Sequence, residues 1–469
     1  MPICKKLFKI TIHILFVTVF IFFSTLEAKN SDKFDKAENI ADYFSGILLL
    51  NQSKYNESFK YLKNLDGLEK SHTTYSSKYL FSLINSGNFS QAFNFSKKIE
   101  KENQGSFESD LIIGTFYLKN SKFDIAKEYF SKAKKRKSRS ILDGYVANTL
   151  FVWSNLKNSD LDQAVLYLNK LDSRFENLKK IQNVFLNCFF GSNNSEELFD
   201  KLTSDSKTDF SRYNSFYAKY LDDIKKYDKA KNIIDSSLKK YPRNLLLNQY
   251  KVDIDNSKNT FNFDCKKETD VAAELLYIAA NALSSQSIYP LSNFYINLSK
   301  YLNKDFKSFD ILLAENFYKI EDYLNSKRIY KILISQGRAF KWYSNKQIAR
   351  ILIKEGQKEK SLSLLSKSYN ELPTKGVYEI FDYAEFLKNN EKFEDSIKYY
   401  SEILNLIDVK HPLYPDVTDS RGVAYERINQ WDKAEKDLLA SLKASPNQAY
   451  VINYLAYSWI EQGIKINKS

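Results

Sequence analysis

The C-terminal stretch RGVAYERINQWDKAEKDLLASLKASPNQAYVINYLAYSW, residues 421–459, decides the fold class. It places small residues at Gly422 and Ala434 and an aromatic residue between them at Trp431. The same pattern begins again at Ala456, which lies 34 residues after Gly422. A fixed period of this length predicts a chain built from repeated helix-turn-helix units, each packed on its neighbours.

The same period recurs through most of the chain. Position 8 of each unit falls at Gly46, Leu80, Gly114, Ala218, Ala280, Ala314, Ala349, Ala384, Gly422 and Ala456. Position 20 is small in every unit that we recognise, at Ser58, Ala92, Ala126, Ala164, Ala230, Ser292, Ser326, Ser361, Ser396 and Ala434. Two antiparallel helices that pack closely need a small residue on each at the contact point, and positions 8 and 20 supply them. We expect glycine at position 15 to end the first helix.

Composition also favours helix over strand. The 469 residues include only 12 glycines and 7 prolines, which β-rich folds need for their many turns. An apolar fraction of 43% excludes an intrinsically disordered chain. Because single hydrophobic cores stop growing beyond about 300 residues, this length requires several domains or a repeat array.

The pattern resembles the tetratricopeptide repeat (TPR), a helix-turn-helix of 34 residues, most specifically in residues 273–303 and 421–459. The resemblance implies an all-α solenoid, a right-handed α-superhelix of about 11 to 13 repeats. The chain is similar to exported multi-repeat TPR proteins of Gram-negative bacteria, whose implied role is scaffolding. That resemblance brings no catalytic residues with it.

Departures from the period predict the domain organisation. We expect an N-terminal array over residues 30–252, degenerate over 142–208, and a C-terminal array over 271–469. Residues 253–270 are interpreted as a linker or distorted repeat, with one continuous superhelix and an irregular loop as the alternative. Within the degenerate part, Val152 and Leu186 fit the repeat by spacing.

The last predicted repeat is incomplete. Residues 449–462 read as a first helix, and too few residues follow for a second one. Leu455, Ala456 and Trp459 should therefore lack the packing partner that earlier repeats provide. We interpret this end as a truncated repeat pattern, or alternatively as a cap whose outer face meets a partner.

Residues 1–29 have the three-part layout of a secretory signal. Three lysines precede the apolar run Ile10–Phe23, and Ala28 suits a cleavage site. The run is shorter than the roughly 20 residues that cross a membrane. We therefore predict export to the periplasm, with an uncleaved inner-membrane anchor formed by residues 10–23 as the alternative.

Two further features bear on the compartment and its partners. After residue 29 the cysteines are Cys188 and Cys265, whose spacing does not indicate pairing, so unpaired thiols are the simpler interpretation. The formal net charge is +13. The densest basic cluster is Lys132, Lys134, Lys135, Arg136, Lys137 and Arg139. In an exported protein this cluster suits anionic envelope components such as lipid phosphates, not nucleic acid, or is simply a solvated helix connection.

In a TPR-like solenoid the concave surface carries the function, through positions 2, 5, 9 and 12 of the first helices. In the C-terminal array these positions include Tyr277, Asn281, Tyr343, Lys346, Arg350, Tyr378, Phe381, Glu385, Asp419 and Glu426. Aromatic rings mixed with both charge signs suit an extended peptide or a partner helix, and a solvent-facing surface without a ligand is the alternative. The carboxylate-clamp pattern, Lys at position 5 with Asn at 9, is missing.

Catalysis is not expected. His72 and His411 are the histidines that follow residue 29, and they are far apart in the sequence. A solenoid keeps distant repeats apart, so we expect no His-based catalytic triad. Metalloprotease, nucleotide-binding and serine-hydrolase motifs are absent from the sequence. We therefore expect no cofactor and no small-molecule substrate. The two remaining hypotheses are a non-enzymatic periplasmic scaffold that binds protein or peptide partners, and an inner-membrane-anchored assembly factor for envelope or outer-membrane components.

Overall fold

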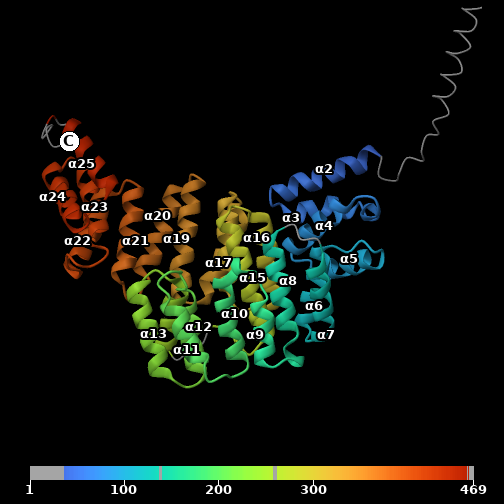
Figure 1. The fold of residues 1–469 in the computed structure, drawn as a ribbon. Coiled ribbons are helices and arrows are strands. Elements are labelled where there is room, and N and C mark those ends of the chain that lie inside the picture. Colours follow the sequence, from blue (N-terminus) through green and yellow to red (C-terminus); the bar gives the residue numbers. More distant parts are fainter. Residues whose placement is uncertain (1–35, 137–139, 257–260, 462, 464–469) are drawn as a thin grey trace, which may run out of the picture. The chain divides into compact units, whose positions relative to one another are not determined.

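The computed structural model describes residues 36–136, 140–256, 261–461 and 463. All regular secondary structure in these ranges is helical, from α2 to α25 together with four short 3-10 turns (Figure 1). The prediction of an all-α fold is confirmed. None of the described helices is both long enough and apolar enough to cross a membrane.

The described residues divide into two compact units, and we treat each by itself. Unit 1 comprises residues up to 172 together with 272–303. Its helix pairs are α2 (Ala37–Asn51) with α3 (Tyr55–Lys63), α4 (Thr73–Asn85) with α5 (Phe89–Lys101), α6 (Phe107–Lys119) with α7 (Phe123–Lys135), α8 (Ile141–Ser154) with α9 (Leu161–Asn169), and α15 (Glu268–Ser285) with α16 (Tyr289–Leu302).

Unit 2 comprises residues 173–271 and 304 onward. Its helices are α10 (Glu176–Phe189), α11 (Ser195–Ser204), α12 (Tyr213–Asp223), α13 (Tyr227–Lys240), α14 (Leu245–Asp255), α17 (Ser308–Lys319), α18 (Tyr323–Leu333), α19 (Arg338–Lys354), α20 (Lys358–Asn370), α21 (Val377–Asn389), α22 (Phe393–Leu406), α23 (Tyr414–Arg427), α24 (Trp431–Ala444) and α25 (Ala449–Glu461). They form successive pairs, except that α14 and α25 have no second helix among the described residues.

The division into units differs from the two arrays expected from spacing, because α16 packs on α4 and α6 of unit 1. The ring of Phe294 stacks on Phe81 at a centroid distance of 4.5 Å. The side-chain amide of Asn293 donates to the Tyr55 hydroxyl at 3.1 Å. A repeat period reports only neighbouring units, so it carries no signal for this contact between residues more than 200 positions apart.

In the pairs recognised from the sequence, the two helices pack at positions 8 and 20, as predicted. All ten position-20 residues are buried. A Cβ atom added to Gly114 at position 8 would lie 2.5 Å from the Phe130 ring at position 24. In four pairs a position-20 serine also donates to the position-8 carbonyl oxygen at 2.7 to 2.9 Å: Ser58 to Gly46, Ser292 to Ala280, Ser326 to Ala314 and Ser361 to Ala349. Serine at this position therefore ties the two helices together.

The turn inside each described pair except α8–α9 has a left-handed residue at position 15, whether or not that residue is glycine; in α8–α9 the position-15 residue, Ser159, has φ −138°. Positive φ angles occur at Gly87, Gly356 and Gly463, and equally at Ser53, Ser121, Lys225, Ser287, Glu321, Glu391 and Asn429. Gly191 has φ +65° between α10 and α11, which aligns Val184 with position 8 in place of Leu186. A positive φ is strained for a residue other than glycine. The packing of the two helices against each other holds the turn in this conformation.

The segment over residues 241–271 departs most from the repeat. Phe261 and Phe263 are each only 5% exposed. Their rings lie 5.2 and 4.6 Å from the ring centroid of Phe216, and Phe261 also packs against Phe306. This otherwise polar segment therefore contains two buried aromatic side chains, Phe261 and Phe263, that attach it to unit 2.

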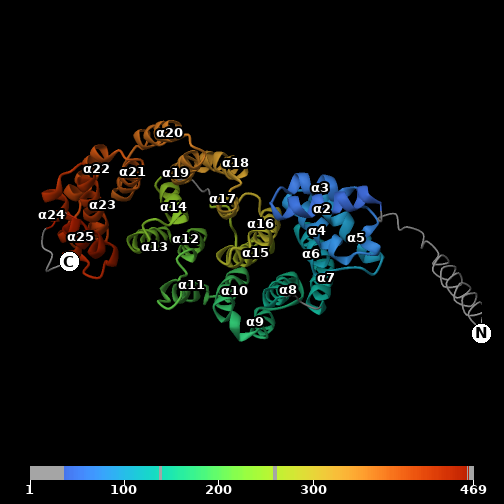
Figure 2. The same ribbon diagram turned by 90° about the horizontal axis from the view of Figure 1, so that it is seen from above.

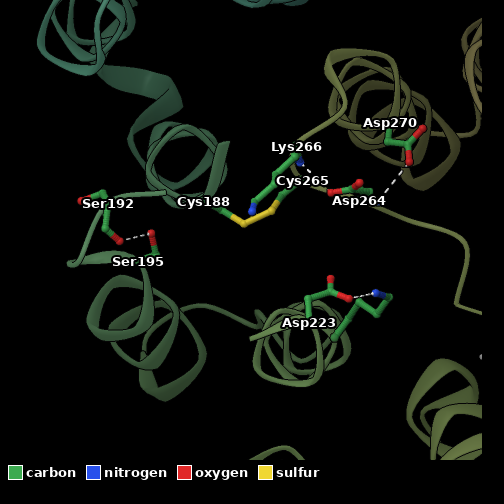
Figure 3. The surroundings of a disulfide bond; sticks show 9 residues. Cys188, Ser192, Ser195, Asp223, Asp264, Cys265, Lys266 and Asp270 are labelled. Atoms are coloured by element: carbon green, nitrogen blue, oxygen red, sulfur yellow. Dashed lines mark hydrogen bonds and ion pairs between the residues drawn. A yellow bond between two sulfur atoms is a disulfide. The ribbon is translucent and has the colours of Figure 1, made fainter. Parts of the chain in front are cut away.

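A disulfide joins this segment to α10. Cys188 on α10 is bonded to Cys265, which lies 77 positions later in the sequence, and their Cα atoms are 6.0 Å apart (Figure 3). The expectation of unpaired thiols was wrong. Sequence spacing could not reveal the pair, because the aromatic packing of residues 261–263 is what brings Cys265 to α10.

The last helix, α25, is better packed than we expected. Leu455 and Trp459 are 2% and 9% exposed, and both lie in a cluster with Leu438 of α24. The indole N–H of Trp459 donates to Glu435 at 2.6 Å. No second helix follows α25 among the described residues, and the preceding pair covers Leu455 and Trp459 instead. Ala456 is only half-buried, in contrast to the position-8 residues of the other units.

Candidate functional site

The ten predicted surface residues fall in both units. Tyr277 and Asn281 lie on α15 in unit 1, where Tyr277 is half-buried and Asn281 is exposed. The other eight belong to unit 2, on α19, α21 and α23.

On α19, two predicted residues are engaged with the preceding pair. The Tyr343 hydroxyl donates to the Glu315 carboxylate on α17. Burial raises the pKa of Glu315 above its usual range, and the hydrogen bond from Tyr343 opposes that rise. The Arg350 guanidinium lies 4.4 Å from the ring centroid of Tyr318. Both side chains therefore join neighbouring repeats.

On α21, the predicted residues converge on an arginine that we did not predict. Arg243 pairs with Asp382 at 2.7 Å, and Lys346 pairs with the same carboxylate. The Arg243 guanidinium also lies 5.6 Å from the ring centroids of both Tyr378 and Phe381. Arg243 comes from the loop before α14, so a segment distant in sequence covers part of the predicted face.

Further along the same face the predicted residues are acidic. Glu385 accepts hydrogen bonds from the Tyr400 hydroxyl at 2.5 Å and pairs with Lys388 at 2.9 Å. Asp419 on α23 has a pKa raised to about 6, chiefly by burial and further by the charges of Glu385 and Asp416 against the opposing effect of Lys388. Its Oδ1 is buried without a hydrogen-bond partner among the described residues.

Glu426, the last predicted residue, is also engaged within the fold. Its carboxylate accepts a hydrogen bond from the Tyr454 hydroxyl on α25 at 2.7 Å. This contact joins α25 to the first helix of the preceding pair.

A cavity of about 620 Å³ opens beside the Arg243 contact. It is lined by side chains from residues 242–255, 338–347 and 372–382, and we call it the α14 cleft. Three of the predicted residues line it: Tyr343, Lys346 and Tyr378. The volume lies within the range of about 300 to 1,000 Å³ that is usual for ligand pockets.

Helix α14 packs beside α19 (Figure 2), and its residues form one wall of the cleft. The side-chain carbonyl of Gln249 accepts the backbone N–H of Ala339 at 3.0 Å, in the first turn of α19. Gly337 allows this approach, since its φ is +139° and a Cβ atom there would lie 2.3 Å from the Gln249 amide. Gln249 therefore satisfies one of the N–H groups that every helix start leaves unpaired.

Sequence reasoning missed Arg243, Asp382 and the α14 wall. Asp382 stands at position 6 of its repeat, outside the positions 2, 5, 9 and 12 that we expected to face a partner. Arg243 and Asp382 are 139 residues apart in sequence. The available signal was the irregular interval of 62 residues between Ala218 and Ala280, which left α14 without a second helix.

The basic cluster is largely occupied within unit 1. Lys132 pairs with Glu100 and Glu128, each at 2.9 Å, and Arg136 pairs with Asp110 at 2.8 Å. Lys134 lies over an aromatic ring, whereas Lys135 is exposed. Lys137 and Arg139 lie outside the described residues. The expected contact with anionic envelope components has no support here.

Comparison with known proteins yields structural likeness only. No protein-family model and no curated protein matches the chain. Among solved structures, the APC/C hetero-tetramer Cut9–Hcn1 overlaps with TM-score 0.32 and 15% identity, covering 91% of this chain and 84% of that chain. Yeast Tom70 overlaps with TM-score 0.33 and 15% identity, covering 92% and 98%.

A third solved structure, YrrB, is described as a TPR protein with an unusual peptide-binding site. It overlaps with TM-score 0.28 and 16% identity, covering 39% of this chain and 91% of that chain. Overlaps this low transfer no partner or activity. The paired helices, their 34-residue spacing and the crossing at positions 8 and 20 make this chain an α-solenoid of the TPR type.

Proposed function

We propose that this chain is a non-enzymatic scaffold of the bacterial cell envelope that binds peptide segments or helices of partner proteins. The binding surface is the first-helix face of unit 2. The observation that carries this proposal is the α14 cleft, where Tyr343, Lys346 and Tyr378 border a cavity of about 620 Å³. Aromatic side chains supply contact area, and fixed charges set the orientation of a bound segment.

The disulfide supports an envelope location. Structural disulfides persist in oxidising compartments such as the periplasm and are rare in the cytosol. The Cys188–Cys265 bond closes a loop of the chain inside unit 2, as expected of a structural bridge. The signal-like layout of residues 1–29, which lie outside the described residues, agrees with export.

Site-specific cross-linking tests the binding surface. A photoreactive phenylalanine analogue replaces Tyr378 in the cleft or, as a matched control, Tyr227, which is 59% exposed on α13 of the same unit. Irradiation of intact cells should give discrete protein adducts at position 378 and none at 227. Equal adducts at both positions, or none at 378, would contradict a partner site on the first-helix face.

Fractionation with N-terminal sequencing tests the location. A soluble periplasmic protein that begins near Lys29 supports the scaffold as proposed. A membrane-bound protein that retains Met1 supports the alternative, an inner-membrane-anchored assembly factor that uses residues 10–23. A cytosolic protein with a reduced Cys188–Cys265 pair would overturn both.

A further inference from the structure

We propose that the α14 cleft binds a short extended peptide segment that carries a carboxylate beside an apolar side chain, with the carboxylate bound by Arg338. The inference rests on the proposed scaffold function and specifies the chemistry of the bound segment.

Positive charge gathers at one end of the cleft. Arg243 and Lys346 share a single carboxylate, Asp382, and the Arg243 side chain remains 52% exposed. Arg338 donates to the carbonyl oxygen and the hydroxyl of Thr374, at 2.5 and 2.7 Å, and both are neutral acceptors. The guanidinium has five N–H groups, so it keeps donors for a further acceptor. Three cations thus line this end of the cleft, and two of them pair with Asp382.

The other charges of the cleft reduce this excess but do not cancel it. The Glu379 carboxylate lies close to Gly376, the N-cap of α21, and offsets one of the three cations. Lys251 pairs with Asp235, so these two charges offset each other. Asp255 is at the far end of α14, about 15 Å along the helix from Leu245. The end of the cleft near Arg338 therefore keeps three cations against two carboxylates, which favours an anionic group.

Apolar side chains border the charged end. Trp342 is 6% exposed and Leu372 9%, and both line the cleft together with Tyr378. The indole N–H of Trp342 is buried without a hydrogen-bond partner among the described residues. An apolar side chain of a bound segment would gain contact area against these rings, as at other protein–peptide interfaces.

The length of the cleft suits an extended segment. Leu245, Asn248, Val252 and Asp255 line one wall along α14, and this stripe is about 15 Å long. An extended peptide advances about 3.3 Å per residue, so four to five residues fill it. A bound carboxylate and a neighbouring apolar side chain fall within that length.

Panning a phage-displayed library of random heptapeptides on the full chain, with its disulfide formed, tests the specificity. We expect enriched sequences to place Asp or Glu within two residues of Leu, Ile, Val or Phe. One enriched peptide is then synthesised with a fluorescent label, in the original form and with its acidic residue changed to the amide. Fluorescence polarisation measures both affinities.

A double-mutant cycle locates the carboxylate. Arg338→Gln and the peptide amide should each lower affinity on the order of tenfold, and combining them should add little further loss. Arg328→Gln, an exposed position on α18, should leave affinity unchanged. Circular dichroism and the melting temperature of each variant separate lost binding from lost folding.

Three results would overturn this inference. Enrichment of basic peptides would reverse the charge assignment. If acidic peptides bind the Arg338→Gln variant with unchanged affinity, they bind outside the cleft. This result would overturn the inference but not the scaffold function. If panning enriches no sequence, the cleft does not bind short peptides of this kind. The scaffold function would then be decided separately, by the cross-linking at Tyr378.

Discussion

The α23–α24 pair and the segment over residues 241–271 are stabilised by contacts of different range. In α23–α24, Gly422 meets Leu438, and Arg421 pairs with Asp437 through two hydrogen bonds of 2.6 and 2.8 Å. These partners are 16 residues apart. Residues 241–271 depend, besides the aromatic contacts of Phe261 and Phe263, on partners 77 to 139 residues away, at Cys188, Ala339 and Asp382.

The difference shows how the candidate binding site arises. Repeat pairs are stabilised mainly by contacts within a pair and between neighbouring pairs. The non-repeating segment docks on finished pairs, and its docking leaves the α14 cleft between them. The site therefore forms where the periodicity fails.

The largest expected effect comes from removing the disulfide. The double substitution Cys188→Ala and Cys265→Ala should lower the free energy of unfolding of unit 2 by about 2 to 4 kcal/mol, because the bridge restricts the unfolded chain. Hydrogen exchange should accelerate over residues 241–271 and stay unchanged in α23–α24. Dithiothreitol should destabilise the native protein and not the double variant. Uniform acceleration across unit 2 would contradict the distinction between the two regions.

Helix crossings offer a matched pair of glycines in unit 1. Gly114→Ala should destabilise by about 1 to 3 kcal/mol, because its Cβ atom would meet the Phe130 ring at 2.5 Å. Gly144→Ala on α8, with no atom within 4 Å of its Cβ position, should instead stabilise by up to about 1 kcal/mol. Urea denaturation followed by circular dichroism measures both. Equal effects would show that position 8 is not a close contact.

The buried carboxylate of Asp419 gives a pH-dependent test inside a regular pair. Its folded pKa of about 6 lies above the ordinary value of 3.8, so the folded state holds the proton more tightly than the unfolded chain does. Stability is therefore lost as the pH rises from about 4 through 6. Asp419→Asn should raise stability at pH 8 on the order of 1 to 2 kcal/mol and change nothing at pH 3.5. A gain of equal size at both pH values would assign the effect to something other than ionisation.

The smallest expected effect concerns the turn at position 15. Lys225 has φ +63°, which a side chain disfavours, so Lys225→Gly should stabilise by about 0.5 to 1 kcal/mol. Gly356→Ala, at the equivalent turn with φ +75°, should destabilise by a similar amount. Thermal melts of the two variants should shift in opposite directions, and shifts of the same sign would refute a shared left-handed turn.

Sequence reasoning worked where contacts are local. The small residues at positions 8 and 20 predicted the helix crossings, since both partners lie within one 34-residue unit. It did not foresee that the preceding pair covers Leu455 and Trp459 in place of a second helix. Of the predicted surface residues, Tyr343, Lys346 and Tyr378 line the cleft. Arg243 was missed, because a period says nothing about contacts between distant units.

The sequence by itself determined the all-α fold, the length of the repeat and the faces on which its small residues meet. Those features follow from contacts within a unit, which each unit repeats. Only the tertiary structure decided that Cys188 meets Cys265, that α16 packs on α4 and α6, and that α14 forms a wall of the cleft. Each of these contacts occurs once and joins residues far apart in the chain, so it depends on how finished helices pack against one another.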